Sequence, residues 1–263
     1  MNDLLLCICD HLFDKDKLLL LSVTKSANEL KRYVFFRRKV YVNKIQSLFY
    51  FDSFLNVISN GENIMPRCVK SVHVISNQML HIPDTVIKIH IGAHYGLGNI
   101  SALPPSIQHL SVYERKDLQN VYIMCPNIYH LTFYMYAFLY LETLDIPAHI
   151  TSLKLYHTLS KSYKKIIPAT VTHLSLENGD SFNVFDYVPK TITHLKVYQS
   201  HLDLEPNTIS DHIVRLVIVD DYNEMDEILN HQYDNIPDSL QEFIIFDKHR
   251  YKKLIKYIPE RLF

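Results

Sequence analysis

Between residues 65 and 246 the chain repeats one pattern of apolar and polar positions. The shared order is apolar–Pro–x–Ser/Thr–Ile/Val–x–x–Leu–x–Leu/Val, and the clearest copies are IPAHITSLKL (with His149 at the Ser/Thr position), IPATVTHLSL and VPKTITHLKV. These three copies begin at Ile146, Ile167 and Val188, which gives a spacing of 21 residues. Less regular copies begin at Met65, Ile82, Leu103, Cys125, Ile209 and Ile236. A fixed period of this length predicts a solenoid, because one such unit cannot bury its apolar residues without a neighbour.

The last residues of each copy alternate between apolar and variable positions, as a half-buried β-strand does. The proline fixes φ and donates no hydrogen bond, so we place it at a corner before the strand. We therefore predict an α/β solenoid whose parallel strands form a continuous sheet along one face. The alternation directs Leu174, Leu176, Leu195 and Val197 into the core, and His173, Ser175, His194 and Lys196 outward.

The first 64 residues lack the repeat and show helical spacing instead. Leu4, Leu5, Ile8 and Leu12 recur at helical intervals, and Asp14 or Asp16 is the expected N-cap of a second helix. We predict a helical module over residues 1–40, a linking helix over 41–64, the solenoid over 65–246 and a C-terminal cap with a truncated repeat over 247–263. The acidic insertion before Pro237 predicts a short helix from Asp221 to His231.

Composition and charge narrow the class of protein. Of the 263 residues, 48% are hydrophobic, which suffices for a large core, and the net charge of −1 provides no field that would attract nucleic acid or a membrane. The four cysteines form no C-x-x-C pair, so reduced thiols are expected. Acidic residues interrupt the N-terminal apolar run, and no stretch reaches the ~18 apolar residues of a membrane span. We expect a soluble intracellular protein.

No sequence motif points to catalysis. G-x-G-x-x-G, the P-loop, G-x-S-x-G and H-E-x-x-H are all absent, so we expect neither an enzyme nor a cofactor. Histidines do recur on the outward strand positions, and parallel stacking would bring neighbours within about 5 Å. This column contains His109, His130, His173 and His194, with His73 and His90 on a neighbouring row. No Cys, Asp or Glu recurs beside it to complete a metal site, so a polar row or a partner contact is the favoured interpretation.

Both parts of the chain resemble known families. The segment DLLLCICDHLFDKDKLLLLSVTKSANEL, with its leucine-rich first helix, D-K-D turn and Ser-Val-x-Lys segment, resembles an F-box. The repeats resemble FNIP repeats, which are leucine-rich-repeat-like, and GDSFNVFDYVPKTITHLKV (179–197) carries the Phe-Asn pair for which they are named. The combination is similar to the F-box and FNIP repeat-containing proteins of slime moulds and amoeba-infecting giant viruses.

This resemblance implies a non-catalytic substrate receptor of a Skp-cullin-F-box ubiquitin ligase. The helical module would bind a Skp-type adaptor, and thereby the cullin complex, through Leu4, Leu5, Ile8, Leu12 and Val23. The outward sheet face would hold an unknown target protein, with candidate contacts at His109, Ser152, Lys154, His173, Ser175, His194, Lys196 and Arg215. The implied location is the cytoplasm, that of the host cell if the protein is viral, or the nucleus.

Other interpretations of the same residues stay open. The leucines of the helical module are equally suited to form its own core. The whole chain is also consistent with a structural repeat scaffold or a virion-associated protein without a ligase role. A nucleic-acid binder using Lys154, Lys196 and Arg215 is disfavoured by the near-neutral charge.

Overall fold

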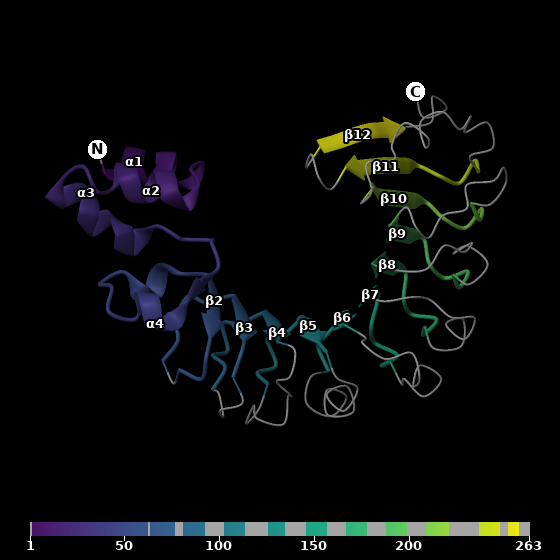
Figure 1. Ribbon diagram of the computed structural model, residues 1–263, viewed down its shortest axis with the longest axis horizontal. Helices are drawn as coiled ribbons and strands as arrows, with labels where there is room; N and C mark the ends of the chain where they lie inside the picture. The colour runs from purple at the N-terminus through teal and green to yellow at the C-terminus, as the bar shows by residue number, and fades with distance from the viewer. Residues whose placement is uncertain are drawn as a thin grey trace. The chain divides into compact units, whose positions relative to one another are not determined.

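The structure is a computed structural model, and it describes residues 2–62, 64–76, 81–92, 103–113, 126–134, 146–156, 167–177, 188–198, 209–220, 237–247 and 252–257. The chain divides into two compact units, Met1–Ile128 and Tyr129–Phe263. Most strands of both units come from the repeats, and the first unit also contains the N-terminal helices (Figure 1). The helix expected at Asp221–His231 and the truncated repeat at 258–263 lie outside the described residues.

The N-terminal helices pack around a small apolar core. They are α1 (Asn2–Asp10), α2 (Asp14–Leu20), α3 (Lys25–Glu29) and the 3-10 helix η1 (Leu30–Tyr33). Their buried apolar residues are Cys9, Leu21, Leu30 and Val34, with Leu5, Leu6 and Leu20 partly buried against them. The helices expected within residues 1–40 are therefore present.

The predicted N-cap of the second helix is wrong. Phe13 occupies the cap position and makes no side-chain hydrogen bond there, and Asp14 is the first helical residue. The Asp14 carboxylate instead accepts a hydrogen bond from the backbone N–H of Arg38, far along the chain. The carboxylate that we expected to cap the helix thus binds a distant backbone group instead.

The linking helix expected over residues 41–64 is also wrong. This segment forms β1 (Val40–Tyr41), the single turn α4 (Val42–Ile45), the 3-10 turn η2 (Phe51–Ser53) and β2 (Asn56–Ser59). The rings of Phe36 and Phe54 stack with centroids 5.0 Å apart, and Tyr50 stacks on Phe54 at 5.8 Å. These aromatic residues pack locally instead of lining one helix face, and β2 pairs in parallel with β1 and β3. The sheet thus begins before the first proline-containing copy.

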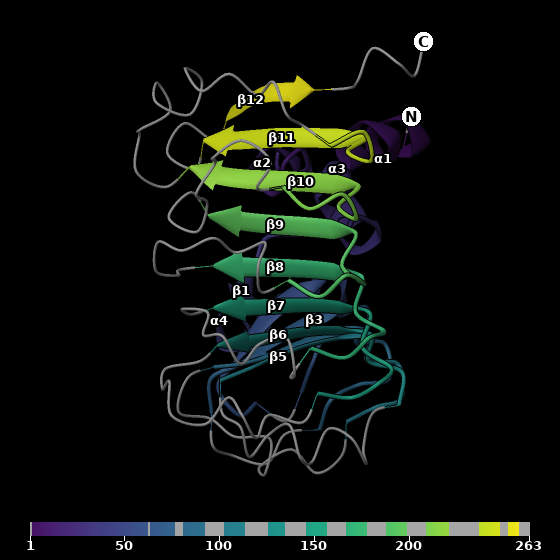
Figure 2. The same ribbon diagram turned by 90° about the vertical axis from the view of Figure 1, so that its right-hand side faces the viewer.

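The repeats form a solenoid with parallel strands, as predicted, but its described residues are those of a β-solenoid and not of the α/β solenoid that we expected. In the first unit β2 is followed by β3 (Ser71–Val74), β4 (Lys88–Ile91) and β5 (His109–Val112). The second unit contains β6 (His130–Tyr134), β7 (Ser152–Tyr156), β8 (His173–Glu177), β9 (His194–Tyr198), β10 (Arg215–Asp220), β11 (Glu242–Asp247) and β12 (Lys252–Tyr257). Figure 2 shows β7 to β11 stacked with the same direction, whereas β12 is antiparallel to β11.

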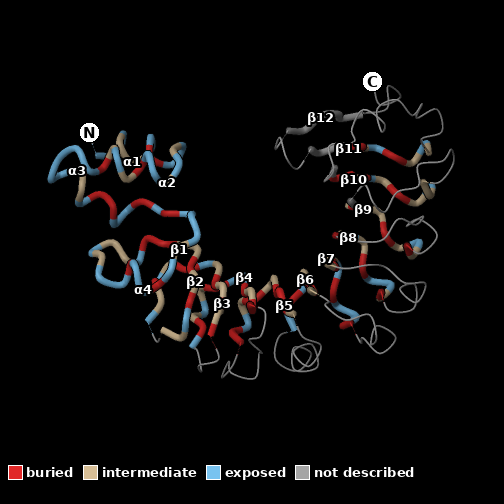
Figure 3. Tube along the Cα trace, in the orientation of Figure 1, coloured by how far each residue is buried: buried red, intermediate tan, exposed pale blue. Residues whose placement is uncertain are grey.

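Each proline begins a turn that leads into a strand. The carbonyl of Pro168 accepts a hydrogen bond from the backbone N–H of Val171 at 3.1 Å. The carbonyls of Pro147, Pro189 and Pro237 likewise accept from the residue three positions later. That third residue is fully buried in copy after copy, as Val171, Ile192 and Ile213 illustrate. The predicted alternation is confirmed (Figure 3), since Leu174, Leu176, Leu195 and Val197 are buried, whereas His173, Ser175, His194 and Lys196 are not. The core is therefore a set of apolar columns running through the coils.

The Ser/Thr two residues after the proline joins one coil to the one before it. Thr170 Oγ1 donates to the carbonyl of Ile150 at 3.0 Å, Ser106 Oγ to that of Val86 at 2.7 Å and Ser239 Oγ to that of Ile213 at 3.2 Å. Each accepting residue occupies the same place in its own copy, three residues after the proline position. The repeated hydroxyl thus has a structural role that the pattern alone did not show.

Candidate binding surfaces

The outward face of the second unit presents side chains in rows. Because the strands pair in register, equivalent residues of successive copies are direct neighbours. The first row contains His130, Ser152, His173, His194, Arg215 and Glu242. The second row includes Thr132, Lys154, Ser175 and Lys196. Seven of the eight candidate contacts are thus brought together on one face, whereas His109 belongs to the first unit.

The expected histidine stack is present at its best pair. The rings of His173 and His194 are parallel to within 18° and their centroids are 4.1 Å apart. Burial, and then the neighbouring His173 and Arg215, lower the pKa of His194. Nδ1 of each ring also lies 2.9 Å from the hydroxyl oxygen of the preceding threonine, Thr172 or Thr193, and forms a hydrogen bond with it. The pair is therefore held in a stacked, hydrogen-bonded arrangement.

Of the three candidate cations on this face, Lys154, Lys196 and Arg215, two form ion pairs. Lys154 Nζ lies 2.5 Å from Glu177 Oε1, and Arg215 Nε lies 2.5 Å from Glu242 Oε2. Glu177 is only 6% exposed, so this carboxylate depends on its lysine for compensation. Neither Lys154 nor Arg215 is a free cation, which weighs further against the nucleic-acid hypothesis.

A tyrosine pair extends the face at the ends of the strands. Tyr134 and Tyr156 stack with centroids 4.2 Å apart, and the Lys154 ammonium lies 4.6 Å from the Tyr156 ring centroid. Burial and the hydrogen bond to Tyr156 raise the pKa of the Tyr134 hydroxyl well above its usual range. Sequence reasoning missed Tyr134, Tyr156 and Glu177. Continuing the strand alternation by one further residue would have included all three.

Lys196 and Ser175 are adjacent on β9 and β8. Burial lowers the pKa of the Lys196 ammonium, and Glu177 opposes this shift. The Ser175 hydroxyl is buried and makes no hydrogen bond with any described residue. This part of the face is half-buried, so its polar groups are only partly accessible to a partner.

The first unit has its own outward face, which the candidate set covered only with His109. There Asn56, Ser71, Lys88 and His109 form one row, and Ile58, His73, His90 and Ser111 form the next. The rings of His73 and His90 are in contact, with centroids 4.1 Å apart and planes tilted by 40°. Lys39, from the segment before β1, lies with its ammonium 3.3 Å from His73 Nδ1.

The helices expose several large apolar residues. Leu4, Ile8 and Val23 are 66%, 42% and 76% exposed, whereas Leu5 and Leu12 are only partly exposed. Leu5 packs against the helical core, so we interpret it as part of the module's interior. Leu4, Ile8 and Val23 take no part in that core, so the structure separates the two roles that the leucine pattern left open.

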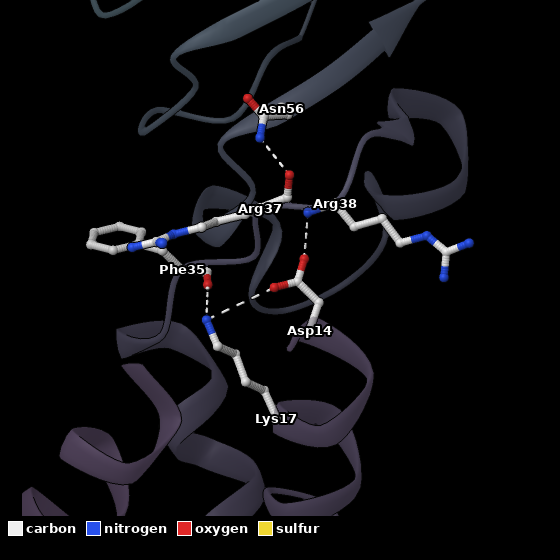
Figure 4. A network of polar contacts seen from close by, with 6 residues as sticks. All are labelled: Asp14, Lys17, Phe35, Arg37, Arg38 and Asn56. Carbon is white, nitrogen blue, oxygen red and sulfur yellow. Dashed lines mark hydrogen bonds and ion pairs between the residues drawn. The ribbon is translucent and has the colours of Figure 1, made fainter. Parts of the chain in front are cut away.

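A polar network joins the helices to the segment before β1 (Figure 4). Lys17 is 3% exposed, and its Nζ donates to the Phe35 carbonyl at 2.9 Å and lies 3.8 Å from Asp14 Oδ1. The Asn56 side chain donates to the Arg37 carbonyl in the same network. Beside it lies a cleft of about 530 Å³ whose lining includes Phe13, Lys15 and Arg38. Asp14 and Lys17 contact each other and backbone groups of the segment before β1. We therefore assign them a structural role, which is to hold that segment against the helices.

The described residues offer no further candidate for a metal site or a membrane span. No group of three or more His, Cys, Asp or Glu side chains there is arranged to hold a metal ion. Among the helices of the described part, none is long and apolar enough to cross a membrane.

Comparison with known proteins assigns no relationship. No protein-family model matches the chain, and neither a curated protein nor a solved structure shows significant similarity to it.

Proposed function

We propose that this chain is a non-catalytic protein-interaction protein, with one binding surface on the helices and another on the sheet. In this proposal the helical module is F-box-like and binds a Skp-type adaptor of a cullin ubiquitin ligase. The solenoid is leucine-rich-repeat-like and holds a target protein on its outward face. The chain then acts by proximity, because it brings the target to the ligase.

The observation that carries the adaptor half is the exposure of apolar side chains on a small helical module. Leu4 and Val23 are about two-thirds or more exposed, at 66% and 76%, although the module has a separate buried core. Leu4 and Ile8 are one turn apart on α1, so their exposed side chains share one face of that helix, and an exposed apolar patch marks an interaction site. The resemblance of this segment to an F-box gives the partner its identity.

The observation that supports the target half is the row arrangement of the outward face. Strands paired in register place polar and aromatic side chains at repeated positions on a preformed surface. Such a surface needs little ordering when a partner binds, which favours affinity.

A pull-down with purified Skp-type adaptor tests the adaptor half. The variant with Leu4→Ser, Ile8→Ser and Val23→Ser should fold normally, since all three residues are exposed, and should lose adaptor binding by at least about tenfold. The matched control carries Ile64→Ser and Ile87→Ser, which are 67% and 38% exposed outside the helices. Control binding should equal that of the wild type.

Equal capture by the triple variant and the wild type would refute docking through these residues. Capture that survives deletion of residues 1–40 would refute docking through the whole module. If the intact chain captures no adaptor at all, the alternative of a structural repeat scaffold or virion-associated protein is the better account.

A further inference from the structure

The outward face of the first unit is basic. Its described strand residues are Asn56, Ile58, Ser71, His73, Lys88, His90, His109 and Ser111, and none of them is acidic. Lys39 adds a second ammonium beside His73. This face therefore combines two lysines with three histidines.

The centre of this face is a compact cluster. The Lys39 ammonium lies 3.3 Å from His73 Nδ1, and the His73 ring lies against that of His90 with centroids 4.1 Å apart and a tilt of 40°. Tyr113 closes the far side, edge-on to His90 at 5.8 Å. Since an ammonium can only donate, His73 Nδ1 must be the acceptor, and the ring is neutral. The charge of Lys39 is thus directed at the cluster, and no carboxylate among the described residues forms an ion pair with it.

Nearby carboxylates of the described chain are used elsewhere. Glu62 accepts hydrogen bonds from the Ser59 hydroxyl and the Asn60 backbone, and Asp52 pairs with Arg67. Neither Lys39 nor Lys88 forms an ion pair with any described residue. On the second unit, by contrast, Lys154 and Arg215 each have a carboxylate at 2.5 Å.

We propose that the outward face of β2–β5 binds an acidic polypeptide segment, whose carboxylates lie against Lys39, Lys88 and the His73–His90 pair. The proposal rests on the proposed role of the sheet as a target-binding surface and does not depend on adaptor binding. It specifies the chemistry of the target: consecutive or alternating Asp and Glu in an extended segment. The charge complementarity of the two surfaces is the argument for this occupant.

A nucleic acid is the less favoured occupant of this face. Tight binding to a phosphate backbone needs several cationic contacts, and this cluster offers two lysines. The chain as a whole is close to neutral, with a net charge of −1. A segment with two or three carboxylates matches the available charge more closely.

The histidine pair gives this binding a pH dependence. Burial, and then Lys39, lower the pKa of His73 to about 4, and burial, His73, Lys39 and Lys88 do the same for His90. His109 pairs with Lys88 on the next strand, and Tyr113 faces His90, so no acidic group of the described chain opposes these shifts. A bound carboxylate raises both pKa values, so the segment is bound together with a proton. Affinity should therefore rise as the pH falls from about 7.5 to about 5.5, where glutamates are still ionised.

Fluorescence anisotropy with a labelled oligoglutamate peptide and the full chain tests the proposal. We expect saturable, salt-sensitive binding that is tighter at the lower pH. Lys39→Gln with Lys88→Gln should weaken it about three- to tenfold, because each exposed charge pair contributes modestly. The matched control is Lys25→Gln with Lys190→Gln, which removes two exposed lysines away from this face and should leave binding unchanged. His73→Gln with His90→Gln should abolish the pH dependence.

Three outcomes overturn the proposal: no saturable binding, equal loss in both lysine pairs, or tighter binding of labelled single-stranded RNA with the same lysine dependence. Thermal melts of every variant confirm that each is folded. Adaptor capture by the same preparations is measured separately, so failure of the peptide assay is distinguishable from failure of the adaptor hypothesis.

Discussion

At the scale of the residue, alternate positions of one strand have opposite environments. Leu174 is 3% exposed and lies between Leu153 and Leu195 of the neighbouring strands. Ser175, the next residue, is on the outward side between Lys154 and Lys196. The strand alternation in the sequence was sufficient to predict these sides. It could not predict that the buried Glu177 pairs with Lys154, because that contact joins two different copies.

Leu174→Ala should destabilise the protein by about 2–5 kcal/mol, since the buried cavity has little freedom to collapse. Leu174→Asp should abolish cooperative unfolding, because it puts an unpaired charge into the apolar column. The matched change Ser175→Ala should be neutral or slightly stabilising, since the Ser175 hydroxyl is buried without a described hydrogen-bond partner. Urea unfolding followed by circular dichroism measures all three. A Ser175→Ala cost as large as that of Leu174→Ala would contradict the assignment of sides.

At the scale of the element, one coil is a proline turn, a buried apolar residue and a strand. The turn is closed locally by the proline carbonyl, whereas the Ser/Thr hydroxyl reaches back to the previous coil. The same position does not behave alike in every copy. Thr170 Oγ1 donates to the Ile150 carbonyl, but Thr191 Oγ1 is buried without a hydrogen bond to any described residue.

Thr170→Val and Thr191→Val therefore form a matched pair. Thr170→Val should cost about 1 kcal/mol, the usual net value of one hydrogen bond. Thr191→Val should cost nothing or stabilise slightly, because it replaces an unsatisfied buried hydroxyl by a methyl group of the same shape. Denaturant midpoints of the two variants decide the matter. Equal costs would show that the hydroxyl does not join the coils.

At the scale of the whole molecule, adjacent histidines in both units link stability to pH. The folded protein depresses the pKa of His73 and His90 to about 4, and it also lowers that of His194. A neutral histidine with a depressed pKa stabilises the fold fully above its unfolded value near 6.5. This stabilisation is lost as the pH falls toward 4, because the unfolded chain takes up protons that the folded chain does not.

Between pH about 7 and pH about 4.5 we expect the His73–His90 pair to account for a loss of roughly 2–4 kcal/mol, after allowance for partial solvent screening. Urea midpoints across this range measure the loss. The variant with His73→Gln and His90→Gln should show a clearly shallower slope, which separates the histidines from carboxylates that titrate in the same range. An unchanged slope would show that the His73–His90 pair is not the source.

The sequence by itself determined the solenoid, the parallel strands and the side to which each strand residue points. These features depend on the local pattern of apolar and polar positions, which recurs from copy to copy. Tertiary structure decided what the period does not contain: the strand at residues 56–59, the pairing of Lys154 with Glu177, and the separation of exposed Leu4, Ile8 and Val23 from the buried core of the helices. The physical reason is that such contacts join residues from different copies or elements. Their energies depend on distances and burial that appear only when the chain has folded.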